Sequence, residues 1–325
     1  MKHRSIEIVA PSRLHFGLMS LGHGPRKFGG VGVMIDAPAL RLCAHTASSF
    51  SVDGTNSTRV EEFARRWAAF HQRQELPACR IEVINTPVSH VGLGSGTQLA
   101  LSVAAILHVM TETPFPKPAE LSLSVGRGQR SAVGTYGFSL GGLIVERGKS
   151  TGELISPLDC HMSIPADWRF VLFCPKDMLG LSGRTEQFAF DHLPSMTSDK
   201  AVQLAEEVRL HMLAALAEEN FAEFGESVFR YGFGSGTCFA DFQDGEAYNG
   251  IRLKQLVDAA RSLGVHGVGQ SSWGPTLFAI MPDKGAALGF VEGIRKTTFE
   301  ADLEITLASG SSHGARICEL TPAVE

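Results

Sequence analysis

The segment VGLGSGT, at residues 91–97, combines a glycine turn with small hydroxylated residues directly before an apolar run of helical length. Its candidate ligand-binding residues are Gly92, Gly94, Ser95, Gly96 and Thr97. A glycine-rich loop that opens a helix presents unpaired N–H groups and the positive end of the helix dipole, which suits a phosphate group. The alternative is a helix cap in which the glycines allow tight packing.

Arg13 and His15 form a second candidate pair. In an extended segment over residues 12–18 they lie on one side of the chain, with Leu14 and Phe16 on the other. Such a segment can present a cation and a titratable group to a ligand while its far face packs in the core. The alternatives are a surface ion pair for Arg13 and a hydrogen-bonded structural role for His15.

Two further glycine-bounded segments carry paired cations. Arg26 and Lys27 lie in the loop GHGPRKFGGVG, where glycines let the backbone approach a ligand. Arg127 and Arg130 are three residues apart, so one helical turn would place both guanidinium groups on the same face. Paired guanidinium groups suit bidentate binding of a phosphate or carboxylate. A solvated hairpin and surface arginines paired with acids are the alternatives.

The late segment GVGQSSWGP is the last candidate. Gln270, Ser271 and Ser272 carry side chains that can donate hydrogen bonds to an anion, and Trp273 can stack on a ring. The alternative is a strained turn with Trp273 in the core.

Composition limits the function classes. The 325 residues include 44% hydrophobic and 19% charged residues, as in a globular protein. The net charge of −5 argues against a positive electrostatic field over the whole surface, which would attract nucleic acid or an anionic membrane. The N-terminal sequence lacks an apolar signal core, and the apolar stretch at residues 99–110 is too short to span a bilayer. The six cysteines show no CxxC spacing, so we expect reduced thiols and a cytoplasmic location.

Periodicity then predicts the elements that must position these residues. Strands are expected at residues 5–10, 31–35, 41–52, 80–85, 138–145, 170–174, 302–307 and 315–320, with Pro11 ending or redirecting the first. Helices are expected at residues 60–72, 99–107, 119–125, 199–216, 222–230, 251–263 and 284–296. The polar stretch at residues 150–167 predicts a domain boundary, which divides the chain into residues 1–160 and 161–325.

Several motifs together resemble the GHMP superfamily of small-molecule kinases: an N-terminal APSR strand, the central VGLGSGT loop and the late GVGQSSWGP turn. The resemblance implies an α+β, GHMP-kinase-like fold with two domains. The N-terminal domain would contain a left-handed, ribosomal-protein-like βαβ unit, and the C-terminal domain would be ferredoxin-like, with the site in the cleft between them.

Differences from the kinases point to a non-kinase branch. Residues 127–134 contain no carboxylate where a kinase usually has a catalytic aspartate, and QSSW replaces the late glycine run. SRLHFGL, FGGVGVMID, GRGQRSAVG with FSLGG, and GVGQSSWGP resemble the β-ribofuranosylaminobenzene 5′-phosphate synthases of tetrahydromethanopterin biosynthesis, a pathway to a one-carbon carrier.

That resemblance implies a decarboxylating pentosyltransferase, which joins phosphoribosyl pyrophosphate to 4-aminobenzoate or 4-hydroxybenzoate and releases CO2 and pyrophosphate. It implies magnesium on the leaving pyrophosphate, for which Glu186 is the candidate ligand, and a homodimer. Arg13 would hold the benzoate carboxylate, Trp273 or Phe28 would stack on the ring, and His15 would orient or protonate a ligand oxygen. An ATP-dependent kinase and a non-catalytic metabolite sensor of the same fold stay open as alternatives.

Overall fold

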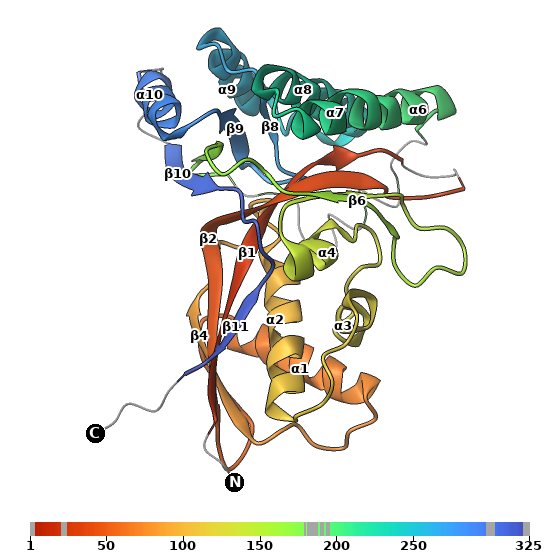
Figure 1. Cartoon of the computed structure of the whole chain (residues 1–325), viewed down its shortest axis with the longest axis vertical. Helices are drawn as coiled ribbons and strands as arrows, with labels where there is room; N and C mark the ends of the chain where they lie inside the picture. The colour runs from red at the N-terminus through yellow and green to blue at the C-terminus, as the bar shows by residue number, and fades with distance from the viewer. Residues whose placement is uncertain are drawn as a thin grey trace.

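The part of the chain that the structure describes is organised around two β-sheets (Figure 1). The structure is a computed structural model, and it describes residues 4–20, 25–178, 180, 188, 192, 196–296 and 303–320. Within these residues the predicted α+β class is confirmed.

The first sheet has seven strands, and two of them are long. Its main path runs β11-β1-β2-β4-β3, and β5 pairs with β2 and with β6. The strands are β1 (Ser5–Leu18), β2 (Gly30–Thr46), β3 (Ser51–Gly54), β4 (Cys79–Asn85), β5 (Leu143–Glu146), β6 (Leu158–Met162) and β11 (Arg316–Glu319). β3 and β4 are parallel and are joined by a helix, which makes a βαβ unit.

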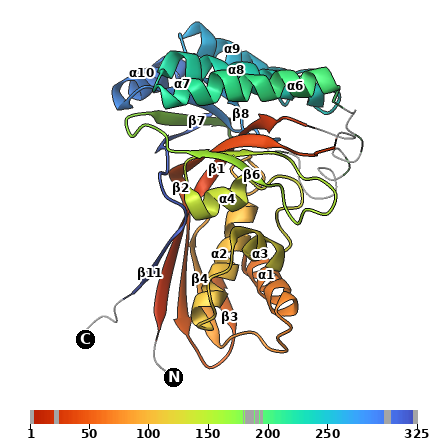
Figure 2. The same ribbon diagram turned by 45° about the vertical axis from the view of Figure 1, so that its right-hand side comes forward.

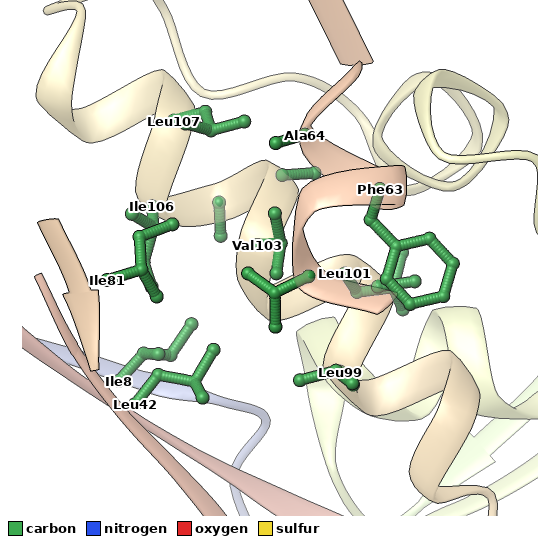
Figure 3. Close-up of a cluster of buried hydrophobic side chains, with 14 of the residues drawn as sticks. Ile8, Leu42, Phe63, Ala64, Ile81, Leu99, Leu101, Val103, Ile106 and Leu107 are labelled. Atoms are coloured by element: carbon green, nitrogen blue, oxygen red, sulfur yellow. The ribbon is translucent and has the colours of Figure 1, made fainter. Parts of the chain in front are cut away.

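Helices cover one face of the lower half of this sheet. They are α1 (Ser57–Phe70), α2 (Ser95–Met110), α3 (Pro118–Ser124) and α4 (Val133–Leu140). α2 is apolar on nearly every side and is buried on nearly every side, because it lies between the sheet and the other helices (Figures 1 and 2). Ile8, Leu42 and Ile81 of the sheet face Val103 and Ile106 of this helix in one core (Figure 3).

The second sheet is antiparallel and has the order β10-β7-β9-β8. Its strands are β7 (Arg169–Pro175), β8 (Val268–Gln270), β9 (Leu277–Met281) and β10 (Leu303–Ser309). The helices that accompany it are α6 (Ser198–Glu206), the π-helical turn η1 (Glu207–Met212), α7 (Leu213–Ala217), α8 (Phe221–Gly236), the 3-10 helix η2 (Thr237–Phe242), α9 (Ile251–Ser262) and α10 (Lys284–Ile294).

β7 is buried on both faces, which explains its continuous apolar sequence. Phe170 and Leu172 point into a core shared with β1, β2 and α8. Val171 and Phe173 alternate with them and point into a separate core under α9 and α10. The upper half of the first sheet therefore packs against the second sheet and α8 through one continuous apolar layer.

Three local predictions differ from the structure. Pro11 does not end the first strand, since β1 continues to Leu18 across a register shift between Ala10 and Ser12. The strands expected at residues 31–35 and 41–52 are one strand, β2, and residues 51–54 form the separate β3. Residues 138–140 belong to α4 rather than to a strand, because a Gly141–Gly142 turn with positive φ at both residues starts β5 later.

The boundary between residues 160 and 161 stays a prediction. β6 spans this point and pairs with β5, and β11 returns from the end of the chain to pair with β1. All six cysteines are free. Among the described residues, no helix has the length and apolar character needed to cross a membrane.

Candidate active site

Two adjoining cavities collect most of the predicted site residues. The larger has a volume of about 380 Å³ and lies between the end of β1, residues 126–131, the end of α8 and the turn after β8. The smaller, of about 200 Å³, surrounds the start of α2. The residues that line both cavities are Arg13, Thr97, Arg127, Ser272 and Trp273.

The predicted glycine loop does open a helix. Gly94 is the residue before α2 and has a left-handed backbone with φ 69°. The first N–H groups of a helix have no partner within the helix, so the N-terminus of α2 offers donors and a positive dipole to the smaller cavity. Ser95 turns its hydroxyl away, toward the carbonyl of Val88 at 3.4 Å. Donation to a ligand there falls to the backbone rather than to the Ser95 hydroxyl.

Three guanidinium groups surround this helix start. A Cβ on Gly94 would lie 3.3 Å from Nε of Arg13, and a Cβ on Gly96 would lie 2.7 Å from Nη2 of Arg59 and 3.5 Å from Nη2 of Arg127. Each glycine therefore makes room for an arginine. Among the described residues that line the two cavities there is no aspartate or glutamate, so the cavities favour anions.

Arg127 and Arg130 lie at the larger cavity, but not through the helical turn that their spacing suggested. Residues 127–132, between α3 and α4, are not helical, so no helical turn aligns the two side chains. Both arginines nevertheless line the larger cavity. Gly126 and Gly128 have positive φ, and this bends the segment so that both side chains reach the same cavity.

His15 belongs to a chain of buried polar groups. Its Nε2 lies 3.1 Å from Oγ of Ser131, and that hydroxyl donates to Oε1 of Glu146 at 2.5 Å. Burial, followed by the charge of Arg13, lowers the pKa of His15 well below its usual value. Burial raises the pKa of Glu146 to about 7, against the opposing hydrogen bonds from Ser131 and Ala132.

Hydrogen bonds from the turn at residues 270–273 join β1 to the glycine loop before α2. The Ser271 hydroxyl accepts from the backbone N–H of His15 at 3.0 Å and donates to the carbonyl of Gly92 at 2.7 Å. Gln270 accepts from the N–H of Asn249 and donates to the carbonyl of Ser272. The side chains of Ser271 and Gln270 are thus engaged in holding the turn, the glycine loop and β1 in register.

The structure places Trp273 in the core and also at the wall of the cavities. It is 6% exposed and packs edge-on against Phe239, with the ring centroids 4.7 Å apart, in a small apolar cluster with Leu18. Phe28 packs against the same cluster. Trp273 also lines both cavities, so it is a core residue that forms part of the cavity wall.

The remaining candidates lie away from these cavities or outside the description. Arg26 pairs with both oxygens of Glu153, at 2.9 and 3.0 Å, and Lys27 bridges to Lys149 through its backbone. Glu186 lies outside the described residues. The described residues hold no cluster of three or more His, Cys, Asp or Glu side chains suited to a metal ion.

Sequence reasoning missed three residues of the site. Arg59 lies on α1, 30 residues before its hydrogen-bond partner Ser89, and has no local signal. Glu146 ends the apolar strand LIVE, and a carboxylate at the end of a fully buried strand was the available signal. Ser131 was part of the quoted GRGQRSAVG motif but was not singled out.

Comparison with known proteins first gives the class. Residues 212–299 match the family model described as GHMP kinases C terminal. A homoserine kinase from Cytophaga hutchinsonii superposes with a TM-score of 0.66 at 17% identity, over 97% of each chain. Mevalonate diphosphate decarboxylase from Staphylococcus aureus gives a TM-score of 0.60 at 12% identity, over 97% of this chain and 98% of that one. The fold is GHMP-kinase-like, as the sequence predicts.

Curated relatives then give the family. A β-ribofuranosylphenol 5′-phosphate synthase from Archaeoglobus fulgidus is 30% identical over 293 residues, which cover 85% of this chain and 87% of the relative. The relative of the same name from Methanothermobacter thermautotrophicus is 28% identical over 305 residues, covering 86% and 90%. The chain belongs to this family of synthases.

Proposed function

We propose that this protein is a decarboxylating phosphoribosyltransferase, which joins phosphoribosyl pyrophosphate to a para-substituted benzoate and releases CO2 and pyrophosphate. The observation that carries the proposal is the arginine-lined cavity at the start of α2, which adjoins a larger cavity with an aromatic wall. The relatives are named for a phenol product, which favours 4-hydroxybenzoate as the acceptor.

The smaller cavity suits the leaving pyrophosphate. Arg59 and Arg127 lie over the first turn of α2, near the positive end of its dipole. As the bond from the anomeric carbon to pyrophosphate breaks, negative charge grows on the leaving group. Preorganised donors aimed at that charge lower the barrier most.

Arg13 lies where the two cavities meet, so it suits the carboxylate of the acceptor. Two anions must approach each other here, and a guanidinium group between them offsets their repulsion. Arg130 lines the larger cavity and suits the 5′-phosphate of the donor. Phe239 and Trp273 supply an apolar wall against which an aromatic ring can pack.

The reaction itself then depends mainly on positioning. The ring carbon that bears the carboxylate bonds to the anomeric carbon, and loss of CO2 returns the bonding electrons to the ring. We keep magnesium as a proposal. The described residues that line the two cavities provide no carboxylate to hold this ion.

The test is release of pyrophosphate from phosphoribosyl pyrophosphate, with trapping of labelled CO2 from the benzoate carboxyl group. Both products should depend on the benzoate, and ATP with small alcohols should give no turnover. Benzoate-independent release, or ATP-dependent phosphorylation in its place, would overturn the proposal.

Arg59→Gln tests the anion site. Loss of a charge-assisted hydrogen bond is worth about 1.5–3 kcal/mol, so KM for phosphoribosyl pyrophosphate should rise roughly 10- to 100-fold. Arg65→Gln is the matched control, because Arg65 lies on the same helix but pairs with Glu61 at the surface. If the two substitutions raised KM equally, Arg59 would not bind the donor.

A further inference from the structure

Glu146 is a buried carboxylate that the binding of the donor leaves unexplained. It is fully buried at the end of β5. Oε1 accepts the hydroxyl proton of Ser131 at 2.5 Å, and Oε2 accepts the backbone N–H of Ala132 at 2.7 Å. A buried carboxylate is costly unless it is hydrogen-bonded, and these two bonds, with further ones from the Ser156 side chain and the Val133 backbone, favour the ionised group.

The direction of the Ser131 hydroxyl fixes the state of His15. A hydroxyl has one proton to donate, and that of Ser131 goes to Glu146. Its oxygen can then only accept from His15, which lies 3.1 Å away at Nε2. A neutral imidazole with its proton on Nε2 carries its lone pair on Nδ1.

This lone pair is offered to a ligand. His15 lines the larger cavity, and among the described residues no group hydrogen-bonds to its Nδ1. Arg13 and His15 are two residues apart on β1, so their side chains leave the same face about 7 Å apart. That separation is comparable to the length of a para-substituted benzoate, whose two ends would face the two side chains.

We propose that Glu146 and Ser131 act as positioning residues that hold His15 in the Nε2–H tautomer, so that Nδ1 takes the hydroxyl proton of a para-hydroxybenzoate acceptor. This inference rests on the proposed function. The acceptor O–H bond breaks, the proton goes to Nδ1 and the electron pair stays on the phenolate oxygen. That electron pair drives the ring carbon onto the anomeric carbon as pyrophosphate leaves. Loss of CO2 restores the phenolate, which takes the proton back from His15.

Burial and the surrounding positive charges keep His15 neutral before the acceptor binds, and they oppose its later protonation, which the ionised Glu146 at the other end of the chain favours. Arg13 on β1 lines the same cavity as Arg127 and Arg130 of the segment between α3 and α4, and positive charge opposes protonation of His15. Tyr231 of α8 packs nearby and donates to the carbonyl of Gly17, and burial, followed by the charge of Glu146, raises its pKa well above the usual value. Glu146 is the group in this set that titrates near neutral pH.

Protonation of Glu146 reverses the chain. With its pKa raised to about 7 by burial, Glu146 gains a proton as the pH falls through that value, and it then donates to Ser131. Ser131 in turn donates to Nε2 of His15, which moves the imidazole proton to Nδ1. Turnover of the hydroxy acceptor should therefore fall as the pH drops through about 7.

Glu146→Gln should hold the hydrogen bonds from residue 146 to His15 in this reversed direction at every pH, with little change in side-chain volume. The amide oxygen accepts from Ala132 N–H, and the amide nitrogen donates to Ser131 Oγ. With 4-hydroxybenzoate, kcat should fall roughly 100-fold, the lower range for loss of a general base. With 4-aminobenzoate it should change less than about threefold, because an amino group activates the ring without losing a proton, so no base is needed.

Further variants separate positioning from folding. Ser131→Thr keeps the hydroxyl and should retain most of the turnover of 4-hydroxybenzoate, whereas Ser131→Ala should lose it selectively. Glu82→Gln, at a half-buried position of β4 that lines neither cavity, is the carboxylate control and should behave as wild type in both assays. The 15N chemical shifts of the labelled His15 ring report the tautomer directly, and should show Nε2–H in the wild type and Nδ1–H in Glu146→Gln.

The outcomes are distinguishable. Equal losses with both acceptors, or an unchanged tautomer in Glu146→Gln, would overturn the proposed chain while leaving the synthase function intact. If the wild-type protein turns over neither benzoate, the proposed function and the proton transfer both fail. The tautomer measurement then still decides whether Glu146 and Ser131 position His15.

Discussion

Replacing Glu146 by glutamine should change how the stability of the protein depends on pH. In the folded protein burial raises the pKa of this carboxyl from 4.5 to about 7. Between these values the folded state holds a proton that the unfolded state has released. The stability contribution is present below pH 4.5 and is lost as the pH rises through about 7.

The magnitude follows from the size of the shift. One pKa unit corresponds to 1.36 kcal/mol, so the free energy of unfolding should fall by about 2.5 kcal/mol between pH 5 and pH 8 through this group alone. Glu146→Gln has no proton to lose and should lack this fall. His15, with its lowered pKa, has the opposite sign, but it is present in both proteins and largely cancels in the comparison.

Urea unfolding at pH 5, 6, 7 and 8, followed by circular dichroism, measures the difference in slope between wild type and variant. Glu153→Gln is the control, because the hydrogen bond from Arg26 lowers the pKa of Glu153 to about 2. That residue is ionised in the folded and unfolded states over this range and should add no slope. The same pH dependence in wild type and Glu146→Gln would refute the assignment of a buried, proton-holding carboxylate.

Three other substitutions test the architecture. Gly92→Ala places a Cβ against the carbonyl of Ser271 at a residue with φ 93°, so it should destabilise the protein by about 1–3 kcal/mol and weaken pyrophosphate binding in calorimetry. The control is Gly152→Ala, at φ 88° with no atom near the added Cβ, which measures the backbone strain alone. Ser271→Ala removes the hydroxyl that joins His15 to the glycine loop and should cost about 1–3 kcal/mol in urea unfolding, with a higher KM for the donor. Phe173→Ala should cost about 3–5 kcal/mol by the same method, whereas Phe115→Ala, at a 53% exposed position, should change stability by less than about 0.5 kcal/mol.

The sequence alone predicted those parts of the site where a residue needed for binding is also one that the local backbone requires. The VGLGSGT loop opens α2 because Gly92 and Gly94 adopt conformations that other residues resist, and that requirement is visible in the sequence. The family resemblance extended this to the GHMP-kinase-like fold. Arg13 and His15 lie on β1 at the cavities, as their alternation suggests.

The features that the sequence did not predict depend mainly on contacts between segments far apart in the chain. Arg59 directly precedes the helix expected at residues 60–72, and only the packing of α1 beside α2 brings it to Gly96. Arg26 pairs with Glu153, which lies more than a hundred residues later, so no local sequence pattern predicts that partner. Residues 138–140 read as a strand because phenylalanine and leucine suit either element, and burial against the sheet decides for α4.

The pairing of β11 with β1 has a consequence for biosynthesis. Residues 6–9 receive one of their two neighbours from residues 316–319, and Arg4 is paired with Glu319. A ribosome makes the N-terminal strand first, so its outer edge stays unpaired until nearly the whole described chain has emerged. Unpaired edges are templates for association with other chains. The nascent protein therefore carries an edge open to association until residues 316–319 are made, after all the other described strands and helices.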